Sequence, residues 1–137
     1  MEMQVRLNRG TRVDAVYKGF TIRTDQPARA GGGDVAPAPF DYFLASIGTC
    51  AGFYVMRFLE QRELPVDGVS LTLRTEKDPV TRRISKITLD LGLPGTFPDK
   101  YEKAILRAID QCSVKRHILE PPVFETVIRR PDLVKTA

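Results

Sequence analysis

Two cysteines, Cys50 and Cys112, are the residues of this chain whose chemistry is most distinctive. Cys50 lies midway along the first predicted helix and Cys112 at the end of the second, and each continues an apolar face. A free cysteine often packs in the core as a small hydrophobe, so core packing explains either one alone. If the fold brings the two together, the pair could carry out thiol and disulfide chemistry.

The residues around Cys50 favour a functional interpretation. Its small neighbours leave room beside the sulfur, although small residues also allow close helix packing; they are Gly48, Thr49, Ala51 and Gly52. Within about two helical turns, apolar side chains could line that space and accept an alkyl group, although core packing would use the same residues. They are Phe43, Ile47, Phe53 and Tyr54.

Other catalytic patterns have less support. Residues 113–117 include a basic group that could lower the pKa of a nearby thiol if it faces inward, but such a run is more often solvated. His117 is the only histidine, and nothing local positions it for a catalytic triad. The Gly31, Gly32 and Gly33 run lacks the spacing of a phosphate-binding loop or a dinucleotide fingerprint.

Hydrophobic periodicity predicts the elements that must position the cysteines. We expect one α+β domain over residues 1–137, with element order βββ, α, ββ, α, β and a Pro/Gly-rich loop over 25–39 that could form a lid. The expected helices run from Pro39 to about residue 62 and over 101–112. The expected strands lie within 3–7, 13–17, 20–24, 69–74, 87–91 and 123–128.

Composition limits the class of protein. A chain of 137 residues can bury a core of its own, and two distant cysteines form neither a disulfide framework nor a zinc quartet, so we expect reduced thiols in the cytoplasm. The N-terminus lacks signal-peptide features. The most apolar run, 42–56, would span only about 22 Å as helix, which predicts a core helix. Basic residues are dispersed despite a net charge of +4, so we expect no nucleic-acid partner.

Two segments resemble a known family. Residues 39–50, PFDYFLASIGTC, are similar to the first-cysteine helix of the OsmC/Ohr family, the osmotically inducible and organic hydroperoxide resistance proteins. Residues 108–114, AIDQCSV, resemble its second-cysteine segment, and the expected element order agrees along nearly the whole chain. The resemblance implies the OsmC-like fold, with a long central helix packed on antiparallel sheets in an intertwined homodimer.

The same resemblance implies a reaction and its residues. The Cys50 thiolate attacks a hydroperoxide and becomes a sulfenic acid, and Cys112 condenses with it to a disulfide that an external dithiol reopens. No bound cofactor or metal is implied. An N-terminal arginine supports the thiolate in the family, and the best match is Arg9, with Arg12 and Arg6 as neighbours.

This chain departs from the family at the start of the central helix. Hydroperoxide enzymes of the family place a glutamate after the proline, whereas this chain has Phe40 there and a carboxylate one place later, at Asp41. Phe40 adds to the apolar residues expected to bind substrate. Asp41 either takes the role of the glutamate or caps the helix, because it lies half a turn in angle from Cys50.

We therefore expect a thiol-dependent peroxidase for organic hydroperoxides, in the broader OsmC-like branch. One alternative is a protein of the same fold that binds an apolar small molecule or senses oxidants without turnover. Another, nucleic-acid binding driven by the positive charge, predicts an affinity that falls steeply with salt but has no motif to support it.

Overall fold

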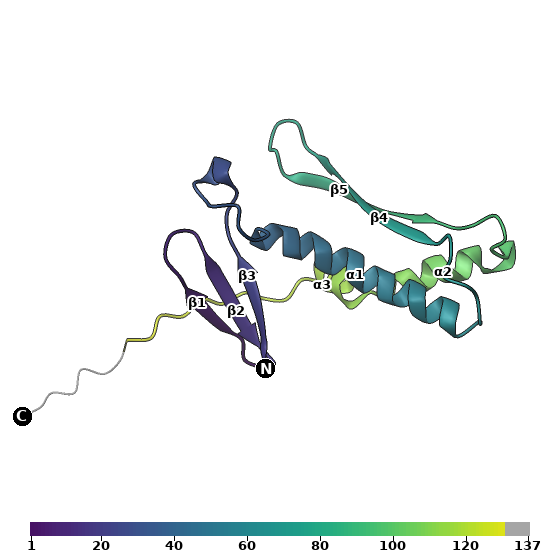
Figure 1. The fold of residues 1–137 in the computed structure, drawn as a ribbon, viewed down its shortest axis with the longest axis horizontal. Coiled ribbons are helices and arrows are strands. Elements are labelled where there is room, and N and C mark those ends of the chain that lie inside the picture. The colour runs from purple at the N-terminus through teal and green to yellow at the C-terminus, as the bar shows by residue number, and fades with distance from the viewer. Residues whose placement is uncertain (131–137) are drawn as a thin grey trace, which may run out of the picture.

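The computed structural model describes residues 1–130 (Figure 1). The chain opens with an antiparallel sheet in the order β1 (Gln4–Leu7), β2 (Val13–Tyr17) and β3 (Phe20–Thr24). Lys18 and Gly19, with φ of 49° and 80°, join β2 to β3 in a two-residue hairpin. Positive φ at both central positions matches the right-handed twist of the flanking strands. The predicted meander and its turn are confirmed.

The glycine-rich loop after β3 is organised by a buried carboxylate. Asp25 is 1% exposed and accepts hydrogen bonds from the Thr11 hydroxyl at 2.6 Å and the Gln26 N–H at 2.8 Å. It also accepts from the N–H groups of Gly33 and Val35 at 3.0 and 3.2 Å. The Thr11 bond, followed by the backbone bonds, outweighs burial and lowers the pKa of Asp25 to about 2. The lid hypothesis for this loop stays a prediction.

The long helix α1 (Pro39–Glu60) begins at the predicted proline. The Asp41 carboxylate accepts a hydrogen bond of 2.8 Å from the Ala38 N–H, which fixes the first turn. With 22 residues, α1 is long and apolar enough to cross a membrane, so the length argument based on 42–56 was wrong. The evidence for a core helix is instead its packing against β4, α2 and α3.

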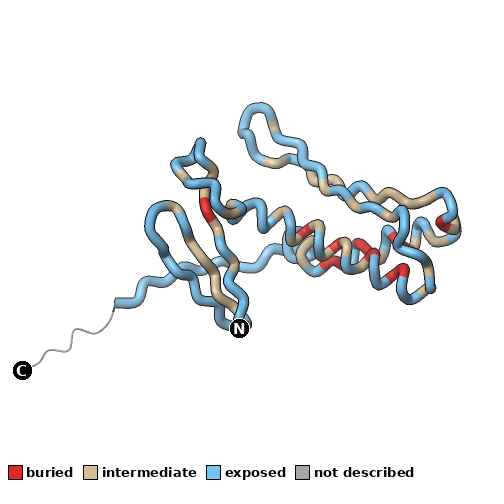
Figure 2. Tube along the Cα trace, viewed as in Figure 1, coloured by how far each residue is buried: buried red, intermediate tan, exposed pale blue. Residues whose placement is uncertain are grey.

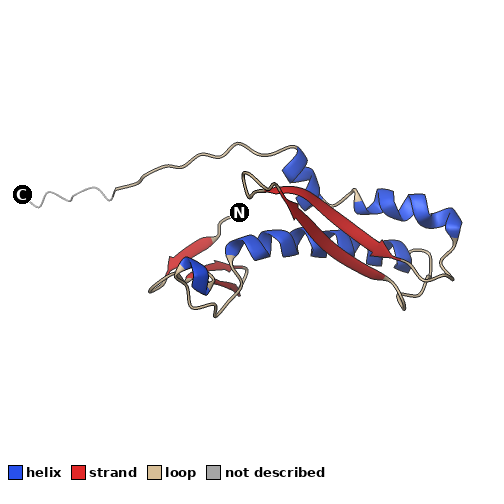
Figure 3. Cartoon of the chain, turned by 90° about the horizontal axis from the view of Figure 1, so that it is seen from above, coloured by secondary structure: helices blue, strands red, loops and turns tan. Residues whose placement is uncertain are grey.

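A hairpin and two short helices flank α1 (Figures 1 and 3). The hairpin consists of β4 (Ser70–Lys77) and β5 (Ile84–Gly92), and its apolar residues alternate as predicted. Short 3₁₀ turns precede α1 (η1, Ala28–Ala30) and the last pair of helices (η2, Asp99–Tyr101). That pair consists of α2 (Glu102–Ile109) and α3 (Ser113–Leu119).

The core lies between α1, α2 and the hairpin (Figure 2). Its buried members are Ala51, Val55, Phe58, Leu59, Phe97, Ile105 and Ile109. Leucines of β4 and β5 pack against this cluster from the other side. The N-terminal sheet contributes no residue to it, and Leu7 and Phe20 there are 84% and 71% exposed. The sheet therefore stands apart from the core of the single chain.

Two predicted elements differ in the structure. The expected helix over 101–112 ends at Ile109, and a new helix, α3, begins after a turn. Cys112 caps α3, because its sulfur accepts a hydrogen bond from the Lys115 N–H. The strand expected over 123–128 is wrong for the single chain, since 121–130 run away from the body without regular structure (Figures 1 and 3). β-Branched residues favour a strand, but a strand also needs a neighbouring edge, and none lies beside this segment in the chain.

Candidate thiol site

The structure brings the two cysteines together at the place where α1 meets the turn between α2 and α3. Both thiols are free; Cys50 is partly buried and Cys112 is 0% exposed. The Sγ of Cys50 lies 3.8 Å from the Ser113 hydroxyl oxygen, and its thiolate can accept a hydrogen bond from the Cys112 thiol. Two cysteines that are 62 positions apart in sequence thus meet through their sulfur atoms, the arrangement that thiol chemistry requires.

The surroundings of Cys50 favour its thiolate. Burial alone would raise the pKa of Cys50, but hydrogen bonds from the Cys112 thiol, the Val114 N–H, and the hydroxyl and N–H of Ser113 together lower it. These backbone donors are the free N–H groups at the start of α3, which no residue of the helix itself can satisfy. No basic side chain of 113–117 is among the groups that shift the pKa of Cys50, and Arg116 and His117 are exposed, which agrees with the solvated alternative.

Cys112 is affected in the opposite direction. Burial raises the pKa of its thiol most, and the hydrogen bond to Cys50 and the charge of the Cys50 thiolate raise it further. The Lys115 N–H, 3.4 Å from the Cys112 sulfur, acts the other way without reversing the shift. The two pKa values are therefore shifted in opposite directions, down for Cys50 and up for Cys112, which is the direction that a nucleophile and a resolving thiol need.

The start of α3 is the part of the site that sequence reasoning missed. One periodic pattern ran through to Cys112, so the break at 110–112 was not expected. The only local signal is Ser113 directly after the cysteine, a residue type that favours helix starts. Its significance depends on where α3 lies relative to Cys50, which a single sequence pattern does not show.

The glycines near Cys50 face the β4 strand rather than the thiol. A Cβ built at Gly48 would lie 4.0 Å from Leu73 Cδ1, and one at Gly52 would lie 3.8 Å from Leu71 Cδ2. Both leucines belong to β4, and at 100° per residue both glycines point about 160° away from Cys50. Gly48 and Gly52 therefore make no room beside the Cys50 sulfur, and they line a hollow of about 480 Å³ between α1 and β4 instead.

The five apolar residues predicted to bind substrate are split between core and surface. Ile47 is 4% exposed, whereas Phe40, Phe43 and Phe53 are 55%, 38% and 54% exposed. The rings of Phe40 and Phe43 lie 5.2 Å apart, and Phe53 meets Tyr54 edge to face at 5.4 Å. They form a largely open aromatic surface along α1, on the side that carries Cys50.

A separate apolar cavity of about 500 Å³ lies between α1, β5, α2 and α3. Sequence reasoning did not find it, because its walls come from four segments that are distant along the chain. It is lined by Ile47, Ile87, Thr88, Leu89, Leu106, Ile109, Asp110, Lys115, Ile118 and Leu119. Neither cysteine lines the cavity, but two of its lining residues, Ile47 and Ile109, each lie three positions before a cysteine.

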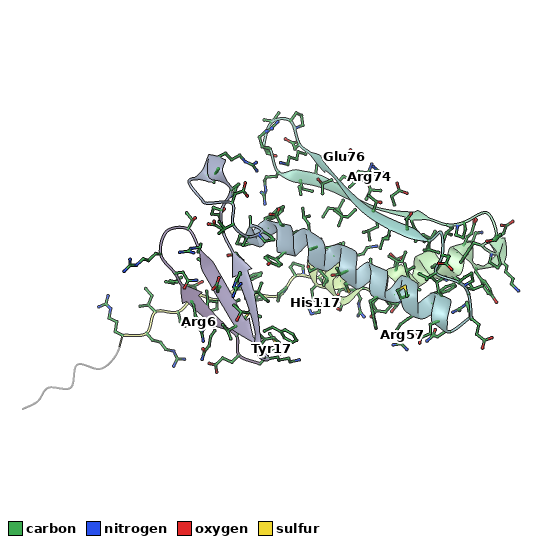
Figure 4. All side chains as sticks on the ribbon, in the orientation of Figure 1. Arg6, Tyr17, Arg57, Arg74, Glu76 and His117 are labelled. Carbon is green, nitrogen blue, oxygen red and sulfur yellow. The ribbon has the colours of Figure 1, made fainter. Side chains whose placement is uncertain are left out.

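The predicted charged partners of Cys50 lie elsewhere in the single chain. Arg9, Arg12 and Arg23 line a hollow of about 520 Å³ on the N-terminal sheet, and none of them acts on the pKa of Cys50. Figure 4 shows Arg6 on that sheet, on a different part of the molecule from α3 and its His117. Asp41 caps α1, as its second interpretation predicted.

Two further features bear on the chemistry of residues 1–130. His117 donates from Nδ1 to the Ser113 carbonyl oxygen at 2.7 Å, a contact within α3 that does not direct the ring to either thiol. No group of three His, Cys, Asp or Glu side chains in this part of the chain lies close enough together to hold a metal ion.

Comparison with known proteins places the chain in a family and a fold. The profile of the OsmC-like protein family matches residues 31–127. A search of curated proteins gives no match. A protein from Psychrobacter arcticus 273-4, provisionally named an osmotic stress induced and detoxification response protein, is similar with a TM-score of 0.69 and 20% identity, over 83% of this chain and 85% of that one.

Two proteins with more specific names share the fold. An organic hydroperoxide resistance protein from Legionella pneumophila has a TM-score of 0.53 and 17% identity, over 86% of this chain and 89% of its own. The organic hydroperoxide resistance protein OhrB of Bacillus subtilis has a TM-score of 0.50 and 16% identity, over 85% and 88%. At these identities the similarity concerns the fold, which agrees with the mixed α+β architecture predicted from the sequence.

Proposed function

Because the chain belongs to the OsmC-like protein family, we propose that it is a thiol-dependent peroxidase that reduces organic hydroperoxides. The observation that supports the proposal most directly is that the pKa values of the two adjacent thiols are shifted in opposite directions. Donors at the start of α3 lower the pKa of Cys50, while burial and the Cys50 charge raise that of Cys112. Two proteins of the same fold are named for organic hydroperoxide resistance, which agrees with this reaction class.

The first step oxidises Cys50. Its thiolate sulfur attacks the terminal peroxide oxygen, the O–O bond breaks, and the alkoxide that leaves takes up a proton to become an alcohol. Cys50 is then a sulfenic acid, and the peroxide has been reduced by two electrons. Hydrogen bonds from the N–H groups of Ser113 and Val114 lower the pKa of Cys50 and so favour its thiolate before the attack.

The second step uses Cys112. Its sulfur attacks the sulfenic sulfur, the S–O bond breaks, and water leaves as the disulfide forms. Burial and the negative charge of Cys50 raise the pKa of Cys112, and oxidation of Cys50 removes that charge, so the Cys112 thiol becomes easier to deprotonate once the sulfenic acid has formed. An external dithiol then reduces the disulfide, and no bound cofactor takes part.

We further propose that the working form is a homodimer in the cytoplasm. Val123 and Phe124 of the extended C-terminal segment are 96% and 89% exposed, and aromatic residues of α1 are also open. So much exposed apolar surface is expected to be covered by a partner, and a second copy would present the same surfaces. In such a dimer, Arg9 of the partner subunit would be the guanidinium that supports the Cys50 thiolate.

The test is steady consumption of cumene hydroperoxide by the protein with excess dithiol. Wild type should turn over and prefer cumene hydroperoxide to hydrogen peroxide, whereas Cys50→Ser should be inactive. Cys112→Ser should lose sustained turnover while keeping one round of peroxide reduction. Thr49→Ser, a neighbouring and exposed change, serves as the matched control and should retain activity. Wild type that consumes neither peroxide contradicts the proposal.

A second function is the binding of an apolar molecule, or oxidant sensing, without turnover. The apolar cavity of about 500 Å³ that Ile47 and Ile109 help to line favours it. That volume is within the range of small-molecule sites. Under this alternative the Cys50–Cys112 disulfide would form reversibly, but added dithiol would not sustain consumption of peroxide. The same assay therefore separates the two functions.

A further inference from the structure

One ion pair spans the turn that carries Cys112. The Lys115 ammonium nitrogen lies 2.5 Å from Oδ1 of Asp110, and the two side chains are 40% and 59% exposed. Asp110 is the first residue after α2, and Lys115 lies in the first turn of α3. The pair therefore links the ends of two helices across the three residues that separate them.

The backbone of the same turn presents the donors to the thiols. Cys112 N–H donates to the Ile109 carbonyl oxygen at 3.0 Å, and the Lys115 N–H points at the Cys112 sulfur at 3.4 Å. The two N–H groups between them in sequence, those of Ser113 and Val114, lower the pKa of Cys50. A small rotation of α3 about this turn would change the direction of all these N–H groups together, because they belong to one helical turn.

The two charges lie at helix ends that do not favour them. A carboxylate at a helix C-terminus and an ammonium in the first turn of a helix each oppose the helix dipole. The contact between Asp110 and Lys115 offsets both unfavourable dipole interactions, and it can form only while α2 and α3 keep their relative orientation. By contrast, Lys86 and Glu76 form an ordinary cross-strand pair on β5 and β4, at 2.9 Å.

Lys115 does not act on Cys50 through its own charge. The groups that shift the pKa of Cys50 are the Cys112 thiol and the backbone and hydroxyl of residues 113 and 114, and the Lys115 ammonium is not among them. Its ammonium is held by Asp110 instead. Any influence of this side chain on the nucleophile must therefore pass through the position of α3.

We propose that the Asp110–Lys115 pair is a positioning device that holds the start of α3, with its N–H groups and the Ser113 hydroxyl, against Cys50. The biological role of the pair rests on the proposed function, but its effect on the Cys50 thiol can be measured without any peroxide. Neither residue touches the reacting atoms. Both are positioning residues for the proposed reaction.

The test is the pH profile of Cys50 alkylation by iodoacetamide, followed by peptide mass in the full-length protein. Lys115→Met and Asp110→Asn should each move the profile to higher pH and slow alkylation near neutral pH about two- to fivefold, the factor expected from an exposed ion pair. Lys115→Arg, which can keep the pair, should restore the wild-type profile. Lys86→Met, which removes the comparable pair of the hairpin, should leave it unchanged.

The outcomes separate this inference from the proposed function. If both variants keep the wild-type melting temperature and the wild-type profile, the pair does not position α3 and the inference is wrong. If the variants shift the profile while wild type consumes no peroxide, the positioning role stands and the peroxidase proposal fails. A shift that Lys86→Met also produces would show a general effect of surface charge and would overturn the inference.

Discussion

Replacing both glycines on the β4 side of α1 tests whether they serve packing or make room beside Cys50. The change is Gly48→Ala together with Gly52→Ala, two positions inside a helix of 22 residues. The added methyl groups would meet Leu73 and Leu71 at 4.0 and 3.8 Å, which is ordinary van der Waals contact. The substitutions therefore introduce no overlap within the chain.

The expected size follows from helix propensity. Glycine in a helix interior is less favourable than alanine by about 0.8–1 kcal/mol, so the double variant should gain about 1.6–2 kcal/mol in free energy of unfolding. For a domain of this size, that gain corresponds to a rise in melting temperature of roughly 6 °C. Peroxide consumption should not change, because both glycines point away from the thiol.

The assay is thermal unfolding by circular dichroism, paired with the peroxidase measurement. Gly32→Ala is the matched control, because its Cβ would lie 1.7 Å from the Gln26 carbonyl oxygen and force the loop apart. It should lower the melting temperature, whereas the helix variant raises it. A helix variant with wild-type or lower stability that also loses peroxidase activity would refute the packing explanation.

Three further changes test the core, the loop and the thiols. Ile105→Ala removes a side chain that is 0% exposed and should cost about 2–5 kcal/mol, seen as a lower urea midpoint; a cost below about 1 kcal/mol would contradict the assigned core. The pKa of Asp25, about 2 in the folded state, lies below its unfolded value, so its stabilisation is complete above about pH 4 and is lost as pH falls towards 2. Asp25→Asn should unfold more easily at pH 7 and lack that part of the pH dependence, and equal urea midpoints at pH 7 would contradict the role of the carboxylate. Cys112→Ala removes a hydrogen-bond donor and should raise the pKa of Cys50, measured by thiolate absorbance, and an unchanged titration would show that Cys112 does not support the thiolate.

Local pattern was enough to predict most of the elements. Alternation defined the meander and the hairpin, Lys18 and Gly19 marked a turn that requires positive φ, and Pro39 marked the start of α1. Each of these features depends on neighbouring residues only. The family resemblance, carried by two short segments, agrees with the match over residues 31–127.

Features that depend on distant residues were not predictable in the same way. The role of Asp25 depends on Thr11 and on a loop residue, Gly33, which only the folded chain brings together. The break before α3 was hidden because Cys112 continues the apolar face of α2 and also caps the next helix. The strand expected over 123–128 failed because the pattern gives a preference, whereas pairing needs an edge that the single chain does not place beside it.

The most direct test of the proposed chemistry is a single turnover followed by intact mass and peptide mapping. Reduced protein is mixed with one equivalent of cumene hydroperoxide in the absence of dithiol. The proposed mechanism predicts a Cys50–Cys112 disulfide in wild type, and in Cys112→Ser a single added oxygen on Cys50 that dimedone traps. Oxidation of Cys112 alone, or two cysteines that remain reduced while the peroxide persists, would contradict the assignment of Cys50 as the nucleophile.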